Sequence, residues 1–580
     1  MKYFLGIYHG HNATVAVLNL DGQVIDCVSE ERFVNVKNKS GFPVHSLKYI
    51  KDKYKNDEIL GIGLPFEFMN AVFLTESDGS YKKDNILNIF LRLMWRILLN
   101  TDREIYSFVY DKYKNILGTY MAKKQIAFTA DYFKLDPKIV KGYNHHLCHA
   151  FPAYYLSPYN KEDALVLTLD GEGDGLSATV SKVVNGKFEM ISTTGLGDSL
   201  GNIYLELTRY LGMKPNEHEY KVMGLAPYAR AEQVEKVYKK IKDWVVVDGL
   251  EFRAKFDTHL AYKYIKKEME GFRFDNIAGA FQKLVEEKMV EWVSNAIKET
   301  NLSTVCCSGG VFMNVKANMK VSQIPDLKKI WILPSCGDES TPLGAAISSY
   351  LDYCKENSLN IDIKPLKDLY LGPSFTNSEI EKFIQEKNIK SKYKVEYHTH
   401  IEKVIAQLIA NGNVVANLSG RMEFGARALG NRSILANPTK PDVIKEINEY
   451  IKNRDFWMPF AASLLEERAD DYVVNPKHLA ADYMIMSFES TMLGKKELRT
   501  AMHQYDFTIR PQIVRRDWNS RYYRILKEFE ALTGIGGILN TSFNLHGSPI
   551  VLGPKEAYYV FENSGIKYLS LENYLISKDV

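Results

Sequence analysis

The sequence has no long apolar run and no excess of charge of either sign. Its most apolar internal stretch, residues 86–99, is interrupted by Arg92 and Arg96. It is shorter than the about 20 apolar residues that a membrane-spanning helix needs, so we interpret it as an amphipathic helix. The apolar start of the chain is too short for a signal peptide and predicts a first strand. With 74 basic and 71 acidic residues, the net charge of +3 gives no case for a basic, nucleic-acid-binding surface. We therefore expect a cytoplasmic protein with no membrane and no nucleic-acid partner.

The cysteines are few, and none belongs to a C-x-x-C motif, which argues against a zinc ribbon. Reduced thiols in the cytoplasm are the simplest interpretation. The six residues are Cys27, Cys148, Cys306, Cys307, Cys336 and Cys354.

No low-complexity segment is present, and the length of the chain predicts more than one domain. Domains usually contain roughly 100–200 residues, so 580 residues are too many for one core. The hydrophobic fraction of 46% and the charged fraction of 25% are those of a globular protein. A polar stretch at 355–367 predicts a linker, with domains at 1–360 and 368–580.

A weak internal repeat predicts a duplicated α/β fold. Residues 5–25 and 165–186 each contain a strand, a polar loop with glycine, a second strand and a tight turn. The turns are Asp21-Gly22 and Asn185-Gly186, dipeptides that strongly favour β-hairpins. The aromatic-rich residues 66–128 have no counterpart in the second copy and are predicted to be a mostly helical insertion. Further strands are predicted at 304–308, 329–333, 414–418 and 536–540.

The motif His145-His-Leu-Cys-His149 is the sharpest local signal. On a helix, residues i and i+4 share a face, so His145 and His149 can present two imidazoles to one metal ion. Imidazole suits Fe, Zn, Ni or Cu, and a carboxylate would complete such a set. The alternative is a surface helix that happens to carry three histidines.

Two acidic features are weaker candidates. Asp338 follows a predicted strand at a helix start, where the residues alone favour an N-cap over a metal ligand. The stretch Asp170-Gly-Glu-Gly-Asp-Gly175 is predicted to be a loop after a buried strand. It is suited to Mg²⁺ or a polar substrate, or it is only a hairpin loop, and its spacing is not that of an EF-hand.

Gly309 and Gly310 open a predicted helix that continues through Asn314. Glycines without a Cβ atom let a nucleotide approach the backbone, and a helix N-terminus favours phosphate. Such a glycine pair is about as often an ordinary turn.

Basic residues stand in otherwise apolar settings of the C-terminal half. They lie in segments 420–433, 452–454 and 508–510, and a predicted strand leads to Ser542 and Asn544. Arg binds phosphate in a bidentate manner and Lys acts as a point charge, which suits a polyanion pocket. The alternative is ordinary structural ion pairing.

Taken together, these strings resemble the NodU/CmcH/TobZ family of O-carbamoyltransferases, nearly end to end from Gly6 to Val551. The matching strings are Glu30-Glu-Arg32 with Lys37, Gly41-Phe-Pro43, His145-His-Leu-Cys-His149, Glu219-Tyr-Lys-Val-Met223-Gly-Leu-Ala-Pro227, Gly309-Gly-Val-Phe-Met-Asn314, Gly337-Asp338, the run 420–433 and Asn540-Thr-Ser-Phe-Asn544.

The resemblance implies both a fold and a reaction. The implied fold is an N-terminal actin-like (ASKHA, TsaD-like) duplicated domain followed by a C-terminal YrdC-like α/β domain. In the family, the YrdC-like domain forms carbamoyl adenylate from carbamoyl phosphate and ATP. The TsaD-like domain then transfers the carbamoyl group to a hydroxyl of an antibiotic, another secondary metabolite or an oligosaccharide, with an iron-type metal. The implied cofactors are ATP and Fe(II) or another divalent metal, with Mg²⁺ as a further option, and a homodimer is left open.

The resemblance also assigns residues by position. His145, His149 and Asp338 resemble the metal ligands, which reverses the preference for Asp338 as a cap. His11 matches a family histidine near the transfer site and would act as a general base on the acceptor hydroxyl. Lys37 is a second catalytic candidate. The implied nucleotide and phosphate contacts are Gly309, Gly310, Asn314, Arg421, Arg432, Lys452, Arg454, Arg510, Ser542 and Asn544.

Three positions depart from the family pattern. Asn12 stands where the family usually has Asp, His9 where some members have an acid, and Met458 where Arg often precedes the proline. They bear on acceptor binding rather than on the reaction class.

Three rival interpretations remain beside this one. A tRNA threonylcarbamoyladenosine-type modification enzyme would need a basic RNA surface, against which the net charge of +3 argues. A hydrogenase-maturation carbamoyltransferase would have the opposite domain order and zinc-binding cysteine pairs. A catalytically inactive nucleotide-binding scaffold would not need to retain Lys452, Arg454, Ser542 and Asn544.

Overall fold

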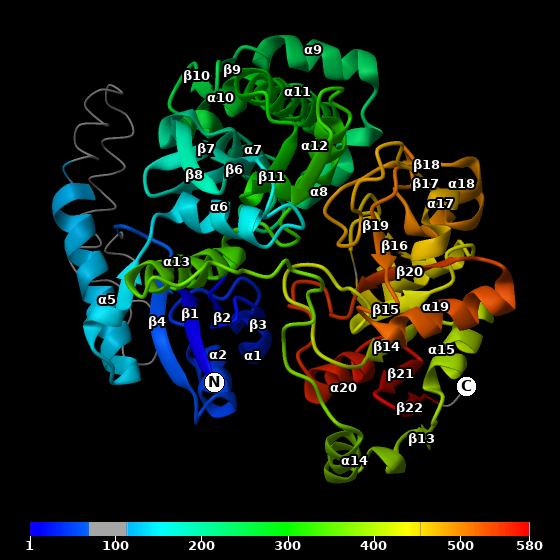
Figure 1. Cartoon of the computed structure of the whole chain (residues 1–580). Coiled ribbons are helices and arrows are strands. Elements are labelled where there is room, and N and C mark those ends of the chain that lie inside the picture. The colour runs from blue at the N-terminus through cyan, green and yellow to red at the C-terminus, as the bar shows by residue number, and fades with distance from the viewer. Residues whose placement is uncertain (69–111, 113, 453, 579–580) are drawn as a thin grey trace. The chain divides into compact units, whose positions relative to one another are not determined.

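The structure, a computed structural model, describes residues 1–68, 112, 114–452 and 454–578 (Figure 1). The chain separates into two compact units. Unit 1 contains Met1–Glu30 and Asn38–Leu366, and unit 2 contains Glu31–Lys37 and Lys367–Val580. The division therefore falls at the end of the polar stretch 355–367, and a short N-terminal segment belongs to unit 2. The predicted helix at 86–99 and much of the predicted insertion at 66–128 lie outside the described residues.

Unit 1 has two five-stranded sheets of the same design. In each, a strand is followed by an antiparallel hairpin on one side, and two parallel strands lie on its other side. The first sheet has the order β3-β2-β1-β4-β5 and the second the order β8-β7-β6-β11-β12. This shared topology is the duplication that the sequence repeat predicts. The strands are β1 Lys2–Tyr8, β2 Thr14–Asn19, β3 Val24–Ser29, β4 Glu58–Leu64, β5 Val140–Gly142, β6 Ala164–Gly173, β7 Leu176–Val184, β8 Lys187–Gly195, β11 Thr304–Ser308 and β12 Lys329–Ile332.

The predicted hairpin turns are present. Gly22 connects β2 to β3 with φ 74°, and Asn185 and Gly186 connect β7 to β8 with φ 52° and 74°. Of the acidic stretch 170–175, which was predicted to be a loop, only Asp174 and Gly175 form a turn, because β6 continues to Gly173 and pairs there with Leu176.

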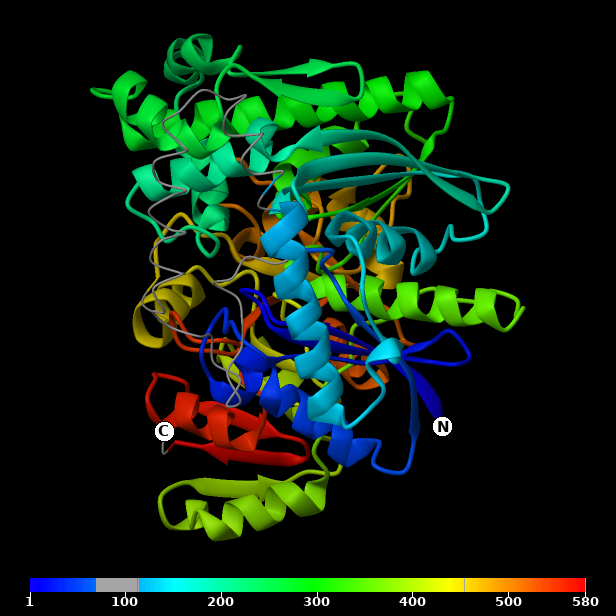
Figure 2. The same cartoon turned by 90° about the vertical axis from the view of Figure 1, so that its left-hand side faces the viewer.

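Helix α13, Thr341–Glu356, packs on β1 and β4 of the first sheet and also on helix α6, His145–Tyr155. Both views of the chain place α13 between the blue strands and α6 (Figures 1 and 2). A Cβ atom added to Gly6 in β1 would lie 1.7 Å from the carbonyl oxygen of Pro342. One added to Gly344 would lie 2.0 Å from the carbonyl oxygen of Cys148. Glycine therefore permits the close approach that brings the start of α13 beside α6.

The remaining elements of unit 1 complete this framework. Long helix α11 packs on α9 and α12, and β9 pairs with β10. These elements are α1 Glu30–Val34 (continuing into unit 2), α2 Val44–Lys53, α5 Thr119–Phe133, α7 Leu200–Tyr210, α8 Glu219–Leu225, α9 Ala231–Ile241, β9 Val245–Asp248, β10 Glu251–Ala254, α10 Ala261–Glu268, α11 Phe274–Thr300 and α12 Val315–Ser322.

Unit 2 is built on one mixed eight-stranded sheet with the order β13-β22-β21-β14-β15-β20-β16-β19. Helices α15 and α19 pack together over it, and their buried residues include Ile405, Ile409 and Phe529. The strands are β13 Lys394–Tyr397, β14 Val415–Leu418, β15 Arg432–Ala436, β16 Ala461–Leu465, β17 Val473–Val474, β18 Glu489–Ser490, β19 Pro511–Val514, β20 Gly537–Ser542, β21 Tyr568–Leu571 and β22 Tyr574–Ser577. The helices are α14 Asn377–Glu386, α15 Ile401–Ala410, α16 Asp442–Lys445, the π-helix η10 Glu446–Lys452, α17 Ala469–Tyr472, α18 Met492–Glu497, α19 Ser520–Thr533 and α20 Pro554–Glu562.

All six cysteines lie in the described part of the chain, where each is buried and none forms a disulfide. Among the described residues, no helix combines the length and the apolar character needed to cross a bilayer.

Candidate functional site

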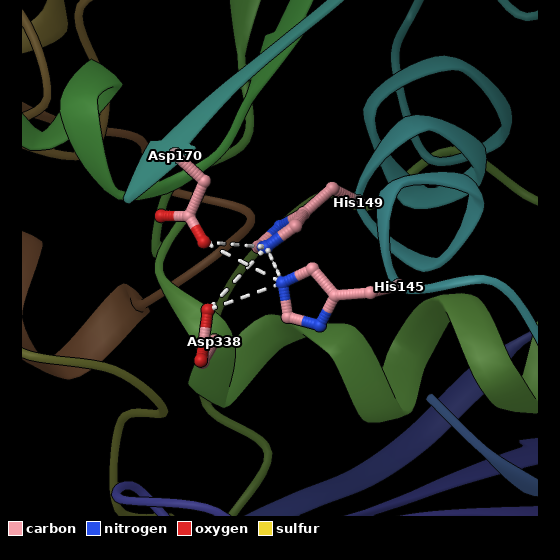
Figure 3. Close-up of side chains that lie close together, drawn as sticks. All are labelled: His145, His149, Asp170 and Asp338. Carbon is pink, nitrogen blue, oxygen red and sulfur yellow. Dashed lines mark hydrogen bonds and ion pairs between the residues drawn. The ribbon is translucent and has the colours of Figure 1, made fainter. Parts of the chain in front are cut away.

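The two outer histidines of the sequence motif lie on the first turns of α6. The helix begins at His145 because Asn144 caps it, accepting hydrogen bonds from the amides of His146 at 3.0 Å and Leu147 at 3.2 Å. Asp174 accepts a further hydrogen bond from the His145 amide at 2.7 Å. The Nε2 atoms of His145 and His149 are 3.2 Å apart, so both imidazoles face the same point (Figure 3).

Two carboxylates complete a buried cluster around that point. Asp170, on β6, places Oδ2 at 3.5 Å from His145 Nε2 and 3.8 Å from His149 Nε2. Asp338, just before α13, places Oδ1 at 3.6 and 3.5 Å from the same two atoms. One ligand atom from each of the four residues lies within 4.8 Å of all the others (Figure 3). This is a donor set that suits a divalent metal ion.

Neighbouring groups hold two of these side chains in place. Ser308 Oγ lies 3.2 Å from His149 Nδ1, which leaves Nε2 directed into the cluster. The Gly310 amide donates to Asp170 Oδ1 at 2.8 Å, so Oδ2 faces the histidines. Such contacts beyond the ligands fix their orientation in metal centres.

The charges of the cluster are strongly coupled. Burial opposes the charged form of His145, but the carboxylates of Asp338 and Asp170 outweigh burial and hold the pKa of His145 well above its usual value. Burial likewise acts against an ionised Asp338, and nearby His11 and His145 still hold its pKa well below the usual range. Two ionised carboxylates side by side in a buried site therefore require positive charge, from protonated imidazoles or from a metal cation.

The structure corrects the sequence-only preference for Asp338 as an N-cap. Gly337 is the N-cap residue of the short helix that begins at Asp338, and no side chain makes a capping hydrogen bond there. The Asp338 carboxylate instead faces the two histidines, as the family resemblance implies.

His11 lies at the edge of the cluster. Its Nδ1 atom is 3.5 Å from Asp338 Oδ2 and 3.5 Å from the hydroxyl of Tyr8. The His11 side chain is 46% exposed. His9, by contrast, is buried, and burial lowers its pKa to about 4.

His146, the middle histidine of the motif, has a different place. Its Nδ1 atom lies 2.7 Å from Thr168 Oγ1, away from the cluster, and burial lowers its pKa to about 3. It is a neutral core residue rather than a ligand candidate.

Of the predicted nucleotide contacts of unit 1, the two glycines lie beside the cluster, and Asn314 lies at the start of α12. Gly309 has φ 105°, and an added Cβ would lie 2.3 Å from the Leu169 carbonyl oxygen, so the glycine turn sits directly on β6. Through the Gly310 amide this turn adjoins the cluster. Asn314 caps α12 by accepting from the Ala317 amide at 3.1 Å, and Asn314 Nδ2 donates to Gln282 Oε1 at 3.0 Å.

Unit 2 gathers the predicted lysine, serine and asparagine at the end of β20. Lys452 Nζ donates to the Ser542 carbonyl at 2.6 Å, to Ser542 Oγ at 2.8 Å and to Asn544 Oδ1 at 2.8 Å. The Lys452 side chain is buried, and these three oxygens hold its ammonium group.

Several cationic side chains of unit 2 lie near Lys452 and Arg510. Burial and the charges of Arg454 and Lys37 lower the pKa of Lys452 well below its usual value. Burial and the charges of Arg427 and Arg454 do the same to Arg510. Among the described residues, buried Arg510 Nε has no hydrogen-bond partner. A cluster of mutually repelling cations with an unpaired buried donor is suited to an anion such as phosphate.

Arg421 and Arg432 are not among the cations that act on Lys452 and Arg510. Arg421 Nε donates to the Gly372 carbonyl at 3.1 Å. Arg432 is fully buried, and its three nitrogens are all used on backbone carbonyls. Its predicted phosphate contact therefore does not fit the structure. The five acceptors are the carbonyls of Pro373, Ser419, Gly420, Asn431 and Leu552.

Comparison with known proteins identifies the family. Residues 3–347 match the family model described as Carbamoyltransferase N-terminus, and residues 406–578 match Carbamoyltransferase C-terminus. The chain belongs to the carbamoyltransferase family. The sequence resemblance is thereby confirmed, and carbamoyl transfer is the chemistry of the group to which this chain belongs.

Relatives of this carbamoyltransferase-family chain match it over nearly all of its length or over part of it. An uncharacterized protein of Methanocaldococcus jannaschii is 32% identical over 587 residues, 99% of each chain. Nodulation protein NolNO of Sinorhizobium fredii is 29% identical over 572 residues, 97% of this chain and 78% of that protein. Nodulation protein U of Rhizobium fredii is 32% identical over 244 residues, 42% of this chain and 38% of that protein. Among solved structures, HypF in its phosphate- and nucleotide-bound form matches 62% of this chain and 47% of its own, with 14% identity and a TM-score of 0.33, a likeness too remote to support an argument.

In this family member, sequence reasoning missed three participants. Asp170 was named only within a predicted loop, although a carboxylate directly after the apolar run 165–169 is a usable signal. Arg427 lies in the shared run 420–433, where nothing local separates it from Arg432. Ser308 gives no signal in the sequence, because only the contact with His149 distinguishes it from other strand serines.

We expect Arg432→Met to destabilise unit 2 of this carbamoyltransferase-family chain. The change removes five hydrogen bonds and leaves the carbonyls of Ser419, Gly420 and Leu552 without this donor, while those of Pro373 and Asn431 keep a backbone amide donor. The loss should cost about 3 kcal/mol or more. For a unit of this size that corresponds to a fall of about 6–12 °C in the midpoint of thermal unfolding. Arg524→Met, at a side chain that is 60% exposed, is the matched control and should leave the midpoint unchanged. Equal midpoints for the two variants would contradict the structural role of Arg432.

Proposed function

We propose that the protein is an ATP-dependent O-carbamoyltransferase that moves a carbamoyl group from carbamoyl phosphate to a hydroxyl of a small molecule. The observation that carries the proposal is the buried cluster of His145, His149, Asp170 and Asp338, inside the region that matches the carbamoyltransferase N-terminal model. The small-molecule or oligosaccharide acceptor is what the sequence resemblance implies. No observation favours the tRNA-modifying alternative.

The cluster fits a divalent metal such as Fe(II). It offers two imidazole nitrogens and two carboxylate oxygens, all buried and directed at one point, with supporting contacts behind three of the four. We therefore propose Asp170 as a fourth ligand beside His145, His149 and Asp338. When bound, the metal would supply Lewis-acid chemistry at the carbamoyl oxygen.

His11 is proposed as the general base of transfer. Its Nδ1 atom faces Tyr8 and Asp338, so Nε2 is the atom that can accept the hydroxyl proton of the acceptor. The alcohol oxygen attacks the carbamoyl carbon, the bond from that carbon to the phosphate oxygen of AMP breaks, and the proton moves to His11 Nε2. The Asp338 carboxylate, 3.5 Å from Nδ1, stabilises the imidazolium that results.

Unit 2 is proposed to be YrdC-like and to form the carbamoyl adenylate. Lys452, Arg454 and Arg510 would bind the phosphates of ATP and carbamoyl phosphate, with Ser542 and Asn544 holding the lysine. Lys37 joins this group, because its segment belongs to unit 2 and its charge acts on Lys452.

Within unit 1, Gly309 and Gly310 remain the proposed approach for the nucleotide portion of the intermediate. Their turn lies against β6, where an added Cβ would meet Leu169 or Asp170, and the Gly310 amide adjoins the cluster. The helix that follows presents its N-terminus, which favours phosphate. Asn314 would act through the helix cap that it provides.

We expect His11→Ala to lower the rate of carbamoyl transfer by roughly 10²–10⁴-fold, the usual contribution of a general base. ATP consumption that depends on carbamoyl phosphate should continue, and the activated carbamoyl group should be lost to water. The measurement is parallel recording of ATP consumption and acceptor carbamoylation. His45→Ala, at a histidine whose side chain is 59% exposed, is the control. A parallel fall of both activities would show that His11 is structural, and no change would remove it from the mechanism.

The function itself is tested by offering the purified protein ATP, carbamoyl phosphate and a set of hydroxylated metabolites. The expected result is a carbamoyl mass gain on one acceptor class, dependent on both ATP and carbamoyl phosphate. Activation without any carbamoylated product across oligosaccharide and antibiotic acceptors would contradict the proposed acceptor class.

A further inference from the structure

Tyr8 is a residue of the site that neither the motif analysis nor the family match singles out. It is the last residue of β1, and its hydroxyl donates to Asp338 Oδ2 at 2.5 Å. The other oxygen of Asp338, Oδ1, is the one that faces His145 at 3.6 Å and His149 at 3.5 Å. Figure 3 shows this single oxygen joined to both histidines. The two oxygens of one carboxylate thus have separate partners.

We propose that Tyr8 is a positioning residue that keeps Asp338 bound to the metal through Oδ1 alone and so leaves a coordination position for the substrate. This inference rests on the metal site of the proposed function. A carboxylate with both oxygens free can bind a metal through both and occupy a position that catalysis needs open. The hydrogen bond from Tyr8 occupies Oδ2 and opposes that rotation.

Gly10 provides independent support for this role. A Cβ atom added to Gly10 would lie 2.0 Å from the Tyr8 hydroxyl oxygen and 2.1 Å from Tyr8 Cζ. The Tyr8 ring therefore lies over residue 10, and a larger side chain there would have to displace it. Gly10 does not have a positive φ, so the space taken by the Tyr8 ring, and not the backbone conformation, favours glycine there.

The position of Tyr8 also connects the cluster with the proposed base. The Tyr8 hydroxyl lies 3.5 Å from His11 Nδ1 as well as 2.5 Å from Asp338 Oδ2. Loss of the hydroxyl would therefore free Oδ2 of Asp338 and remove a neighbour of His11. A phenyl ring at position 8 would keep the packing. Tyr8→Phe therefore tests the role of the hydroxyl in positioning Asp338 without changing the packing of the ring.

The experiment is a Co(II) titration of the full chain followed by visible absorption, which responds to the number and geometry of ligands. Tyr8→Phe is expected to change the affinity for Co(II) by about 10–100-fold, the usual size of effect for groups that orient metal ligands, because both oxygens of Asp338 can then reach the ion. Its absorption spectrum should differ from that of the unchanged protein. Gly10→Ala, which retains the tyrosine but displaces its ring, should give the same altered spectrum. Gly195→Ala is the matched control, because no heavy atom lies within 4 Å of its added Cβ.

Unchanged Co(II) affinity and an unchanged spectrum in Tyr8→Phe would overturn the inference while leaving the metal site intact. If the unchanged protein binds Co(II) no more tightly than His149→Ala does, both the metal site and this inference are overturned. The Co(II) affinity of the unchanged protein therefore distinguishes the two failures.

Discussion

His149→Ala is expected to abolish bound metal and carbamoyl transfer while carbamoyl-phosphate-dependent ATP consumption continues. His149 is fully buried, and its Nε2 atom faces His145 at 3.2 Å and both carboxylates. Alanine removes a ligand that no neighbouring side chain can replace without rearrangement. Lewis-acid stabilisation is worth several kcal/mol, so transfer should fall by about 10³-fold or more.

The measurement is metal content by elemental analysis together with separate assays of ATP consumption and transfer. His146→Gln is the matched control on the same helix, since His146 contacts Thr168 and lies outside the cluster. It should retain metal and transfer. Full metal occupancy and normal transfer in His149→Ala would contradict the assignment of the cluster.

Lys452→Met and Arg510→Met are each expected to lower carbamoyl-phosphate-dependent ATP consumption by about 10–150-fold. Each removes a charge-assisted phosphate contact worth about 1.5–3 kcal/mol. The structure adds a second expectation. The pKa values of both side chains are depressed by burial and by neighbouring cations, so each charge is unfavourable in the unliganded protein. Arg510→Met should therefore not lower the thermal midpoint, whereas Lys452→Met also removes the three hydrogen bonds to Ser542 and Asn544.

Ligand-induced stabilisation gives the check on that reasoning. Pyrophosphate should raise the thermal midpoint of the unchanged protein and raise it much less in the two variants, because binding to the folded state shifts unfolding by mass action. Arg524→Met is the control for surface charge. Normal ATP consumption in both Lys452→Met and Arg510→Met would contradict the proposed anion site and with it the YrdC-like role proposed for unit 2.

Local sequence rules were sufficient for features that depend on nearby residues. The i, i+4 rule predicted that His145 and His149 share a face, and the turn dipeptides predicted both hairpins, including Gly22 and Gly186 in the positive-φ region. The same rules failed for the stretch after Asp170. Its glycines indicate a loop, but pairing with β7 extends the strand to Gly173.

Features that depend on distant segments could not be read from the sequence. The N-cap preference of Asp338 is a local statistic, whereas its carboxylate is turned by contacts with α6 and Tyr8. Arg432 and Arg510 look alike in sequence, since both are arginines in apolar surroundings. Backbone carbonyls from four separate loop segments use every nitrogen of Arg432, while Arg510 Nε is left without a partner among the described residues. Only tertiary structure separates a structural guanidinium from one suited to phosphate.

The measurement that tests the central claim most directly is product analysis with ¹³C-labelled carbamoyl phosphate, ATP and an acceptor mixture. The account predicts that the label appears as a carbamate ester on an acceptor hydroxyl, that AMP and pyrophosphate form in the same reaction, and that His149→Ala forms AMP without the labelled ester. Label transfer that proceeds without ATP, or AMP formation that does not depend on carbamoyl phosphate, would contradict it.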